Sequence, residues 1–182
     1  MEPGPLQIVA DVALPSAAII ISTVVAVGLA RSERKAAAAA RADERIDAAF
    51  VRTLVALATL NTINLRAELA SGPFRELRVG LTLLASVTPE RTDDLLGEWF
   101  EAERVAGNGE AQESMRRLYL VPDPPRSEAD VNAMVEAGAP LNTWARDFAN
   151  NLRVWRRKGL TDAELRSLIV SAKNRSSGTA AA

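Results

Sequence analysis

Three acidic side chains, Asp94, Glu98 and Glu101, have the spacing that places them on one face of a helix. Carboxylates grouped in this way could bind a hard cation or act as general acid and base. A di-iron centre in a helical bundle would also need Glu-x-x-His pairs, and the chain contains no histidine. We therefore favour a solvated acidic face near the start of a helix, where the helix dipole stabilises negative charge.

The lack of histidine and cysteine restricts the chemistry further. Serine–histidine and cysteine–histidine nucleophiles cannot be assembled, and disulfides are excluded. The commonest general base and a common metal ligand are also absent. No glycine-rich phosphate loop occurs, and Gly107-Asn108-Gly109 is interpreted as a turn. The sequence thus predicts no catalytic residue, no metal ligand and no cofactor.

The densest basic segment is Arg153-Val154-Trp155-Arg156-Arg157-Lys158. Its cations, Arg153, Arg156, Arg157 and Lys158, are a candidate contact for anionic lipid or for a protein partner. Nucleic acid is an alternative ligand, with Trp155 stacked on a base. The simplest interpretation places Trp155 in the core and uses the cations to stabilise the carboxyl end of a helix.

The charge of the whole domain argues against nucleic acid. All 22 basic residues follow Ala30, together with 21 of the 23 acidic ones, since only Glu2 and Asp11 precede it. A nearly neutral domain has no general electrostatic attraction to phosphates. We expect no nucleic-acid partner.

Residues 12–30 form an apolar stretch without a charged side chain. A helix of about 20 apolar residues crosses a hydrocarbon core about 30 Å thick, so the sequence predicts a transmembrane helix over residues 12–30. One alternative is a secretory signal peptide, but it would need a basic leader, and residues 1–11 have none. The other is a buried helix of a soluble domain, which would have to be surrounded completely because the stretch is apolar on all sides.

The basic residues Arg31, Arg34 and Lys35 follow the apolar stretch at once and set its orientation. They predict that residues 1–11 are an extracytoplasmic leader and that everything after Ala30 lies in the cytosol. Arginine outnumbers lysine 19 to 3, which is typical of a GC-rich bacterial coding sequence. The expected location is therefore the bacterial inner membrane, as a single-pass protein in contact with membrane lipid.

Small residues recur at four-residue spacing in the apolar stretch, at Ala18, Ser22, Ala26 and Ala30. Small side chains in this pattern let two membrane helices approach closely. They form a candidate transmembrane dimer seam and so predict a homo-oligomer, although alanine is common enough in this chain to produce the pattern by chance.

The distribution of helix formers, caps and apolar stripes predicts an all-α fold. Residues 31–45 are rich in alanine and arginine and predict a helical rod that continues the membrane helix. Apolar density rises from Ile46, which predicts a cytosolic antiparallel helical bundle over residues 46–173. After the first helix, which Ser71-Gly72-Pro73 ends, we expect helices at 74–87, 88–106, 110–120, 127–138, 142–159 and 161–173. Residues 174–182 lack large apolar side chains and are expected to be disordered.

These features together predict a non-enzymatic membrane protein. Its helical domain would bind an unidentified protein partner, as an interaction, accessory or regulatory module at the cytosolic membrane face. One alternative is a membrane-associated enzyme using carboxylates and arginines, which a deep polar pocket would favour. The other is a membrane-tethered nucleic-acid binder. A contiguous exposed apolar patch would favour partner binding.

Overall fold

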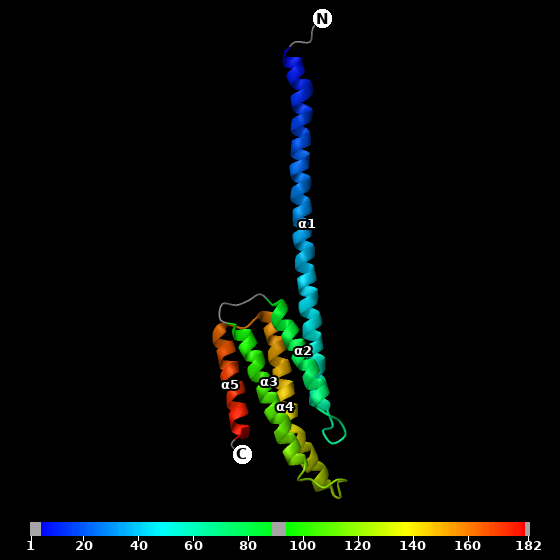
Figure 1. Cartoon of the computed structure of the whole chain (residues 1–182), viewed down its shortest axis with the longest axis vertical. Coiled ribbons are helices and arrows are strands. Elements are labelled where there is room, and N and C mark those ends of the chain that lie inside the picture. The colour runs from blue at the N-terminus through cyan, green and yellow to red at the C-terminus, as the bar shows by residue number, and fades with distance from the viewer. Residues whose placement is uncertain (1–4, 89–93, 181–182) are drawn as a thin grey trace. The chain divides into compact units, whose positions relative to one another are not determined.

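The computed structural model describes the backbone of residues 5–88 and 94–180 and the side chains of residues 29–88 and 94–177. All regular structure in these ranges is helical (Figure 1), which confirms the all-α class there. The helices are α1 (Pro5–Thr62), α2 (Ser71–Val87), α3 (Leu95–Leu118), α4 (Glu128–Lys158) and α5 (Asp162–Ala180). The chain divides into two compact units, residues 1–45 and residues 46–182.

The first unit contains the amino-terminal part of α1. Within the residues that the structure describes, no helix is long and apolar enough to cross a membrane. Most of the predicted transmembrane stretch, and all of the predicted leader, fall at residues 1–28, whose side chains lie outside the described part of the chain. The membrane helix stays a prediction.

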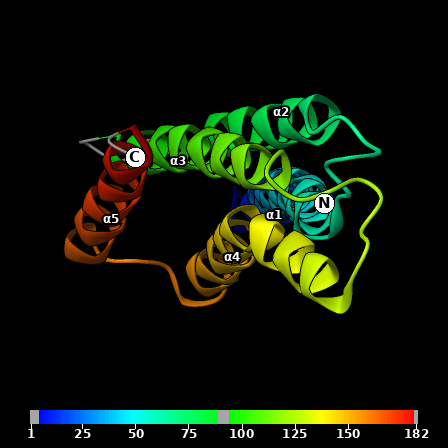
Figure 2. The same cartoon turned by 90° about the horizontal axis from the view of Figure 1, so that it is seen from below.

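The second unit is a helical bundle whose core receives side chains from every helix. Seen along its length, α1 lies between α2 and α4, while α3 lies between α2 and α5 (Figure 2). Aromatic rings fill the centre: Trp99 meets Phe148 edge to face with centroids 5.5 Å apart, and Trp144 lies 5.9 Å from the same ring. Both tryptophans and Phe148 are buried. Aromatic pairs of this kind add to the free energy gained from burial alone.

Helix α3 runs without a break through Gly107-Asn108-Gly109. The predicted turn at these residues, and the separate helix predicted over 110–120, are therefore wrong. Gly107 is buried, and a Cβ atom at this position would collide with the six-membered ring of Trp144. Glycine costs about 1 kcal/mol relative to alanine inside a helix. Here its bare Cα lets the Trp144 ring lie directly against α3, so tertiary packing outweighs the local preference.

Helix α4 is also continuous, with Pro140 in its interior. The prediction of two helices, 127–138 and 142–159, is wrong for a similar reason. Proline removes one backbone donor and disturbs the preceding turn. The neighbouring N–H of Leu141 donates to the Oγ of buried Ser114 on α3, at 3.2 Å. This bond to the adjacent helix satisfies a backbone group beside the proline and allows α4 to continue.

Several predicted helix ends are confirmed. The Ser127 hydroxyl accepts from the N–H of Asp130 at the start of α4. Gly159 ends α4 as predicted: its N–H donates to the carbonyl of Trp155, and its positive φ of 72° is one that glycine adopts readily. Thr161 and Glu164 form the predicted capping box, with the Thr161 N–H donating to the Glu164 carboxylate at 2.8 Å.

Three other predicted ends differ. Helix α1 ends at Thr62, and Ser71-Gly72-Pro73, which was predicted to end it, lies at the start of α2. Thr88 does not begin α3; its N–H and hydroxyl both donate to the carbonyl of Leu84, so it closes α2. The next predicted residues, 89–93, lie outside the described residues, and Asp94 is the residue before α3. Helix α5 continues past the expected end near Lys173 to Ala180. The disorder predicted from residue 174 does not hold at Arg175, which is paired with a buried carboxylate of α3.

Candidate functional site

Large apolar side chains are exposed at the end of the bundle where α1 and α3 terminate. Leu69, Tyr119 and Leu120 keep 84%, 83% and 77% of their surface exposed. A pocket of about 420 Å³ at this end is lined by Leu65, Arg66, Met115, Leu118, Tyr119, Val121 and Asp123. We call this pocket, together with Leu120, which follows Tyr119 in the chain, the Tyr119 surface. Soluble domains rarely expose grouped apolar residues without a partner for them.

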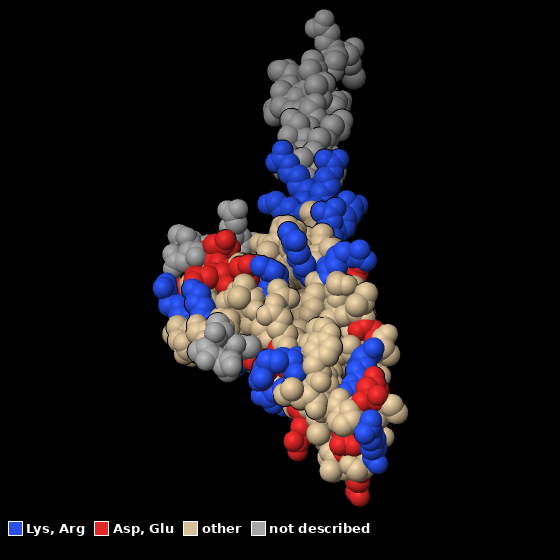
Figure 3. Space-filling view, turned by 60° about the horizontal axis from the view of Figure 1, so that its bottom comes forward, with Lys and Arg blue, Asp and Glu red and all other residues tan. Residues whose placement is uncertain are grey.

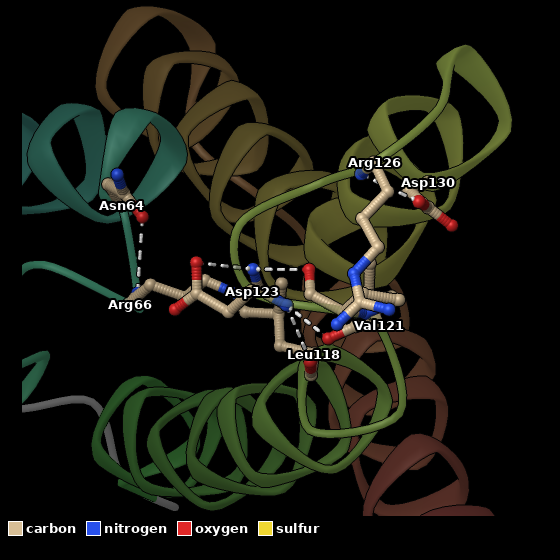
Figure 4. Close-up of polar contacts among 8 residues, drawn as sticks. Asn64, Arg66, Leu118, Val121, Asp123, Arg126 and Asp130 are labelled. Atoms are coloured by element: carbon tan, nitrogen blue, oxygen red, sulfur yellow. Dashed lines mark hydrogen bonds and ion pairs between the residues drawn. The ribbon is translucent and has the colours of Figure 1, made fainter.

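Arg66 builds the rim of the pocket by binding the end of α3 (Figure 4). Its guanidinium donates to the carbonyls of Leu118, Val121 and Pro122, at 3.0, 2.6 and 3.1 Å. It also forms an ion pair with Asp123 at 3.2 Å. Of these three carbonyls, only that of Leu118 belongs to α3, and it also accepts the N–H of Val121 at 3.2 Å; those of Val121 and Pro122 belong to the connector that follows. The Tyr119 surface is therefore held in place by directed hydrogen bonds.

The segments on both sides of the pocket are fixed by local hydrogen bonds as well. The Asn64 side chain accepts the N–H of Arg66 at 3.1 Å, which shapes the turn after α1. On the other side, the Asp130 carboxylate accepts the N–H of Arg126 at 2.8 Å (Figure 4). The connector between α3 and α4 is thus held by Arg66 at one end and by Asp130 of α4 at the other.

The charged side chains next to Tyr119 in α3 are paired with one another. Glu113 accepts from Arg116 and from Arg117, each at 2.7 Å. These two hydrogen bonds lower the pKa of Glu113 to about 2. One carboxylate against two guanidinium groups leaves a local charge of +1, so exposed apolar side chains and paired charges lie close together at this end of α3.

A second polar cluster lies in the core, around the fully buried carboxylate of Glu103. Trp144 donates to it at 3.0 Å, Trp99 at 3.4 Å, and the guanidinium of Arg175 reaches both oxygens at 2.9 Å. Burial raises the pKa of Glu103, and the charge of Arg175 together with the hydrogen bonds opposes that rise. The cluster joins α3, α4 and α5 and accounts for a charge that would be costly if it were unpaired.

A shallow pocket of about 290 Å³ adjoins this cluster and includes Trp144, Arg175, Glu110 and Arg117 in its lining. Burial raises the pKa of Glu110, and the charges of Arg175 and Arg117 act against it. Glu103 itself is fully covered, so its carboxylate faces its three donors and has no surface from which to reach a ligand. The observed arrangement suits a tie between helices.

The burial of Glu103 was not predicted from the sequence. A signal was present, because Trp99, Ala102 and Ala106 are buried on α3 and Glu103 falls among them at helical spacing. An acidic residue within an apolar stripe predicts a buried, paired carboxylate, since unpaired charges are almost never buried.

The structure does not bring the three predicted carboxylates into one site. Glu98 binds Lys173 of α5 at 2.8 Å, whereas Glu101 forms two hydrogen bonds with Arg104 on its own helix. The hydrogen bond from Arg104 lowers the pKa of Glu101. Asp94, at φ 44°, precedes α3. Among the described residues, no group of three or more acidic side chains could hold a metal ion.

The predicted basic contact residues have different surroundings. Arg156 pairs with Asp47 of α1 at 2.7 Å, and Arg153 binds the side chain of Asn150. Arg157 and Lys158 are exposed. Trp155 is half-buried and meets Phe100 edge to face at 6.2 Å, so its ring belongs to the border of the core.

The predicted orientation-setting residues Arg31, Arg34 and Lys35 are exposed on α1. Figure 3 shows basic side chains gathered on this part of the helix. Of the candidate dimer seam, Ala30 is exposed. The side chains of Ala18, Ser22 and Ala26 lie outside the described residues.

Comparisons of the chain with protein-family models, with curated proteins and with solved structures each find no match.

Proposed function

We propose that the protein is a single-pass membrane protein whose helical domain binds a protein partner at the cytosolic membrane face. Residues 12–30 are its transmembrane helix, with the amino terminus outside and the domain inside a bacterial cell. Two sequence features support this: the stretch is long enough to span, and basic residues occur only after it. The part played by the domain is that of an accessory or regulatory module without catalysis.

The Tyr119 surface is the observation that best supports binding of a protein partner. Tyr119 and Leu120, with 83% and 77% of their surface open, would gain about 25 cal/mol for each Å² of apolar area covered. A pocket beside such residues is the usual form of a binding hot spot, where one large side chain of the partner is inserted. We infer that the partner presents an apolar segment with an aliphatic or aromatic anchor.

The enzyme alternative has weaker support. Glu98, Glu101 and Glu103 each bind a cationic side chain of this domain. In the pocket beside Tyr119 the carboxylate of Asp123 is paired with Arg66, and the pocket that includes Glu110 is shallow.

Membrane insertion is tested by alkaline carbonate extraction of cells that make the full chain. We expect the protein to stay in the membrane pellet, and an export-dependent phosphatase fused to the carboxyl terminus to stay inactive. Release by carbonate would contradict the anchor, whereas an active phosphatase would contradict the orientation.

Partner binding is tested with a photo-crosslinking amino acid placed at Tyr119, at Leu120 or at the control position Val170. Val170 lies on α5 and is 57% exposed. We expect a discrete adduct from the first two positions and none from the control. The crosslinked protein, once identified and purified, should bind the full chain directly, and Tyr119→Ser should weaken that binding. Adducts of equal yield from all three positions, or binding that Tyr119→Ser leaves unchanged, would reject the Tyr119 surface as the site.

A further inference from the structure

Between Ile46 and Thr62, helix α1 buries one face in the bundle and leaves the opposite face open. Val51 and Val55 are 57% and 60% exposed there, and they are flanked along the helix by the exposed residues Ala48, Ala58 and Thr62. These five residues follow one another at intervals of three, four, three and four. That alternation is the a/d pattern of a coiled coil, in which two helices pack through a narrow apolar seam.

This seam presents no charge and no unsatisfied hydrogen-bond donor to a partner. None of its five residues is charged. The hydroxyl of Thr62 donates to the carbonyl of Ala58 at 3.1 Å. The hydroxyl of Thr59, beside the seam, donates to the carbonyl of Val55 at 3.0 Å. Both donors are therefore satisfied within α1 and could be covered without loss. The short side chains also allow a facing helix to approach closely.

The residues beside the seam identify the partner. If Ala48 is taken as an a position, Val51 is the following d position. Asp47 then occupies the g position just before Ala48, and Arg52 occupies the e position of the next heptad. In a parallel pair, a g side chain lies beside the e side chain of the next heptad on the other helix, and opposite charges there set orientation and partner. A second copy of this chain therefore places Asp47 beside Arg52 on both sides. An antiparallel pair would bring g beside g and e beside e and would lose this match.

We propose that two copies of the chain pair in parallel through Ala48, Val51, Val55, Ala58 and Thr62 of α1. Asp47 and Arg52 already bind Arg156 and Glu76 of their own bundle, at 2.7 and 2.6 Å. Their side chains are still 61% and 45% exposed, so each carboxylate or guanidinium has room for a second partner at the edge of the seam.

The strength of this pairing depends on the membrane anchor, and in that respect it rests on the proposed function. Fifteen residues of helix extend for about 21 Å. Five short side chains over that length bury far less than the roughly 1,200 Å² of a stable interface. Two copies anchored in one membrane are held parallel and at a high effective concentration, which compensates for a small interface.

Cysteine crosslinking tests the pairing without background, because the chain has no native cysteine. Val51→Cys and Val55→Cys are made in the full chain, with Val170→Cys on α5 as a control of matched exposure. After oxidation of membranes, we expect disulfide-linked dimer from the two seam positions at about ten times the yield from Val170→Cys. Equal yields from all three would indicate random collision and overturn the proposal, as would the absence of dimer from the seam positions.

A second variant separates pairing from other causes of crosslinking. Val55→Glu in the Val51→Cys chain brings two like charges together at the seam, so we expect the yield of dimer to fall about tenfold. Val170→Glu should leave it unchanged. An unchanged yield with Val55→Glu would overturn the proposal.

Failure of the anchor gives a different result from failure of the pairing. A chain that carbonate releases from the membrane refutes the anchor. The released protein is then oxidised at a series of concentrations, and the yield of disulfide-linked dimer is compared between Val55→Cys and Val170→Cys. A higher yield from Val55→Cys supports the pairing, and equal yields refute it. A membrane-integral chain that gives no seam dimer refutes the pairing alone.

Discussion

Gly107 of α3 and Trp144 of α4 meet so closely that residue 107 has no room for a side chain. Alanine is the better helix former by about 1 kcal/mol, yet we expect Gly107→Ala to lower the free energy of unfolding by about 1–3 kcal/mol, because the added methyl group overpacks the core. Urea unfolding followed by tryptophan fluorescence measures the change. Gly72→Ala is the control, because a Cβ atom there would meet nothing within 4 Å. Equal stability of the two variants would contradict the packing argument.

Glu103 should make the stability of the domain depend on pH. Burial raises the pKa of Glu103 in the folded state. A carboxyl group with a raised folded pKa contributes stability that is fully present below the unfolded pKa and is lost as the pH rises through the folded pKa. The wild type should therefore lose stability relative to Glu103→Gln over that interval, by about 1.4 kcal/mol for each unit between the two pKa values. Urea unfolding of both proteins at a series of pH values measures this, and parallel curves would contradict it.

Arg175 and Lys173 provide a matched comparison of a buried and an exposed ion pair. Both lie on α5 and bind glutamates of α3, but Glu103 is 0% exposed and Glu98 is 49% exposed. Arg175→Met leaves a buried carboxylate without its cation, and we expect a loss of about 3–5 kcal/mol at neutral pH. Lys173→Met should cost less than about 1 kcal/mol. Thermal and urea unfolding distinguish these outcomes.

A second substitution tests whether the stranded carboxylate causes the loss of stability expected from Arg175→Met. Adding Glu103→Gln to Arg175→Met removes the stranded charge, so the double variant should recover part of the lost stability. A double variant less stable than Arg175→Met would show that the cost does not arise from the unpaired carboxylate.

Removing the Arg66 side chain should loosen the end of α3. Arg66→Met loses the hydrogen bonds to the carbonyls of Leu118, Val121 and Pro122 and the ion pair with Asp123. Hydrogen bonds that involve a charged group contribute about 1.5–3 kcal/mol, and we expect destabilisation in that range with faster proteolysis in the connector after Tyr119. Arg126→Met is the control, because it is the backbone N–H of Arg126 that binds Asp130. Equal proteolysis of the two variants would contradict the role of Arg66.

The sequence was sufficient to predict features that depend on neighbouring residues. The helix starts at Ser127 and Thr161 and the end at Gly159 follow from local hydrogen bonding. The all-α class and the burial of Trp99 and Phe148 follow from helical spacing of apolar residues.

Features that depend on distant residues were not predictable in this way. The continuity of α3 at Gly107 requires Trp144, and that of α4 at Pro140 accompanies a bond to Ser114. The partner of Glu103 comes from residue 175, in a segment whose composition suggested disorder. The Tyr119 surface was also missed, because exposure of an apolar residue is a property of the packed bundle.

The contacts of Gly107 with Trp144 and of Ser114 with Leu141 have a consequence for motion within the domain. Both join α3 to α4, one by close steric fit and the other by a hydrogen bond. A slide of one helix along the other by a single turn, about 5.4 Å, would drive the Trp144 ring against a residue with a side chain and leave the Leu141 N–H facing no acceptor. These two contacts therefore oppose sliding of α3 along α4, whereas a small rotation or tilt could preserve both.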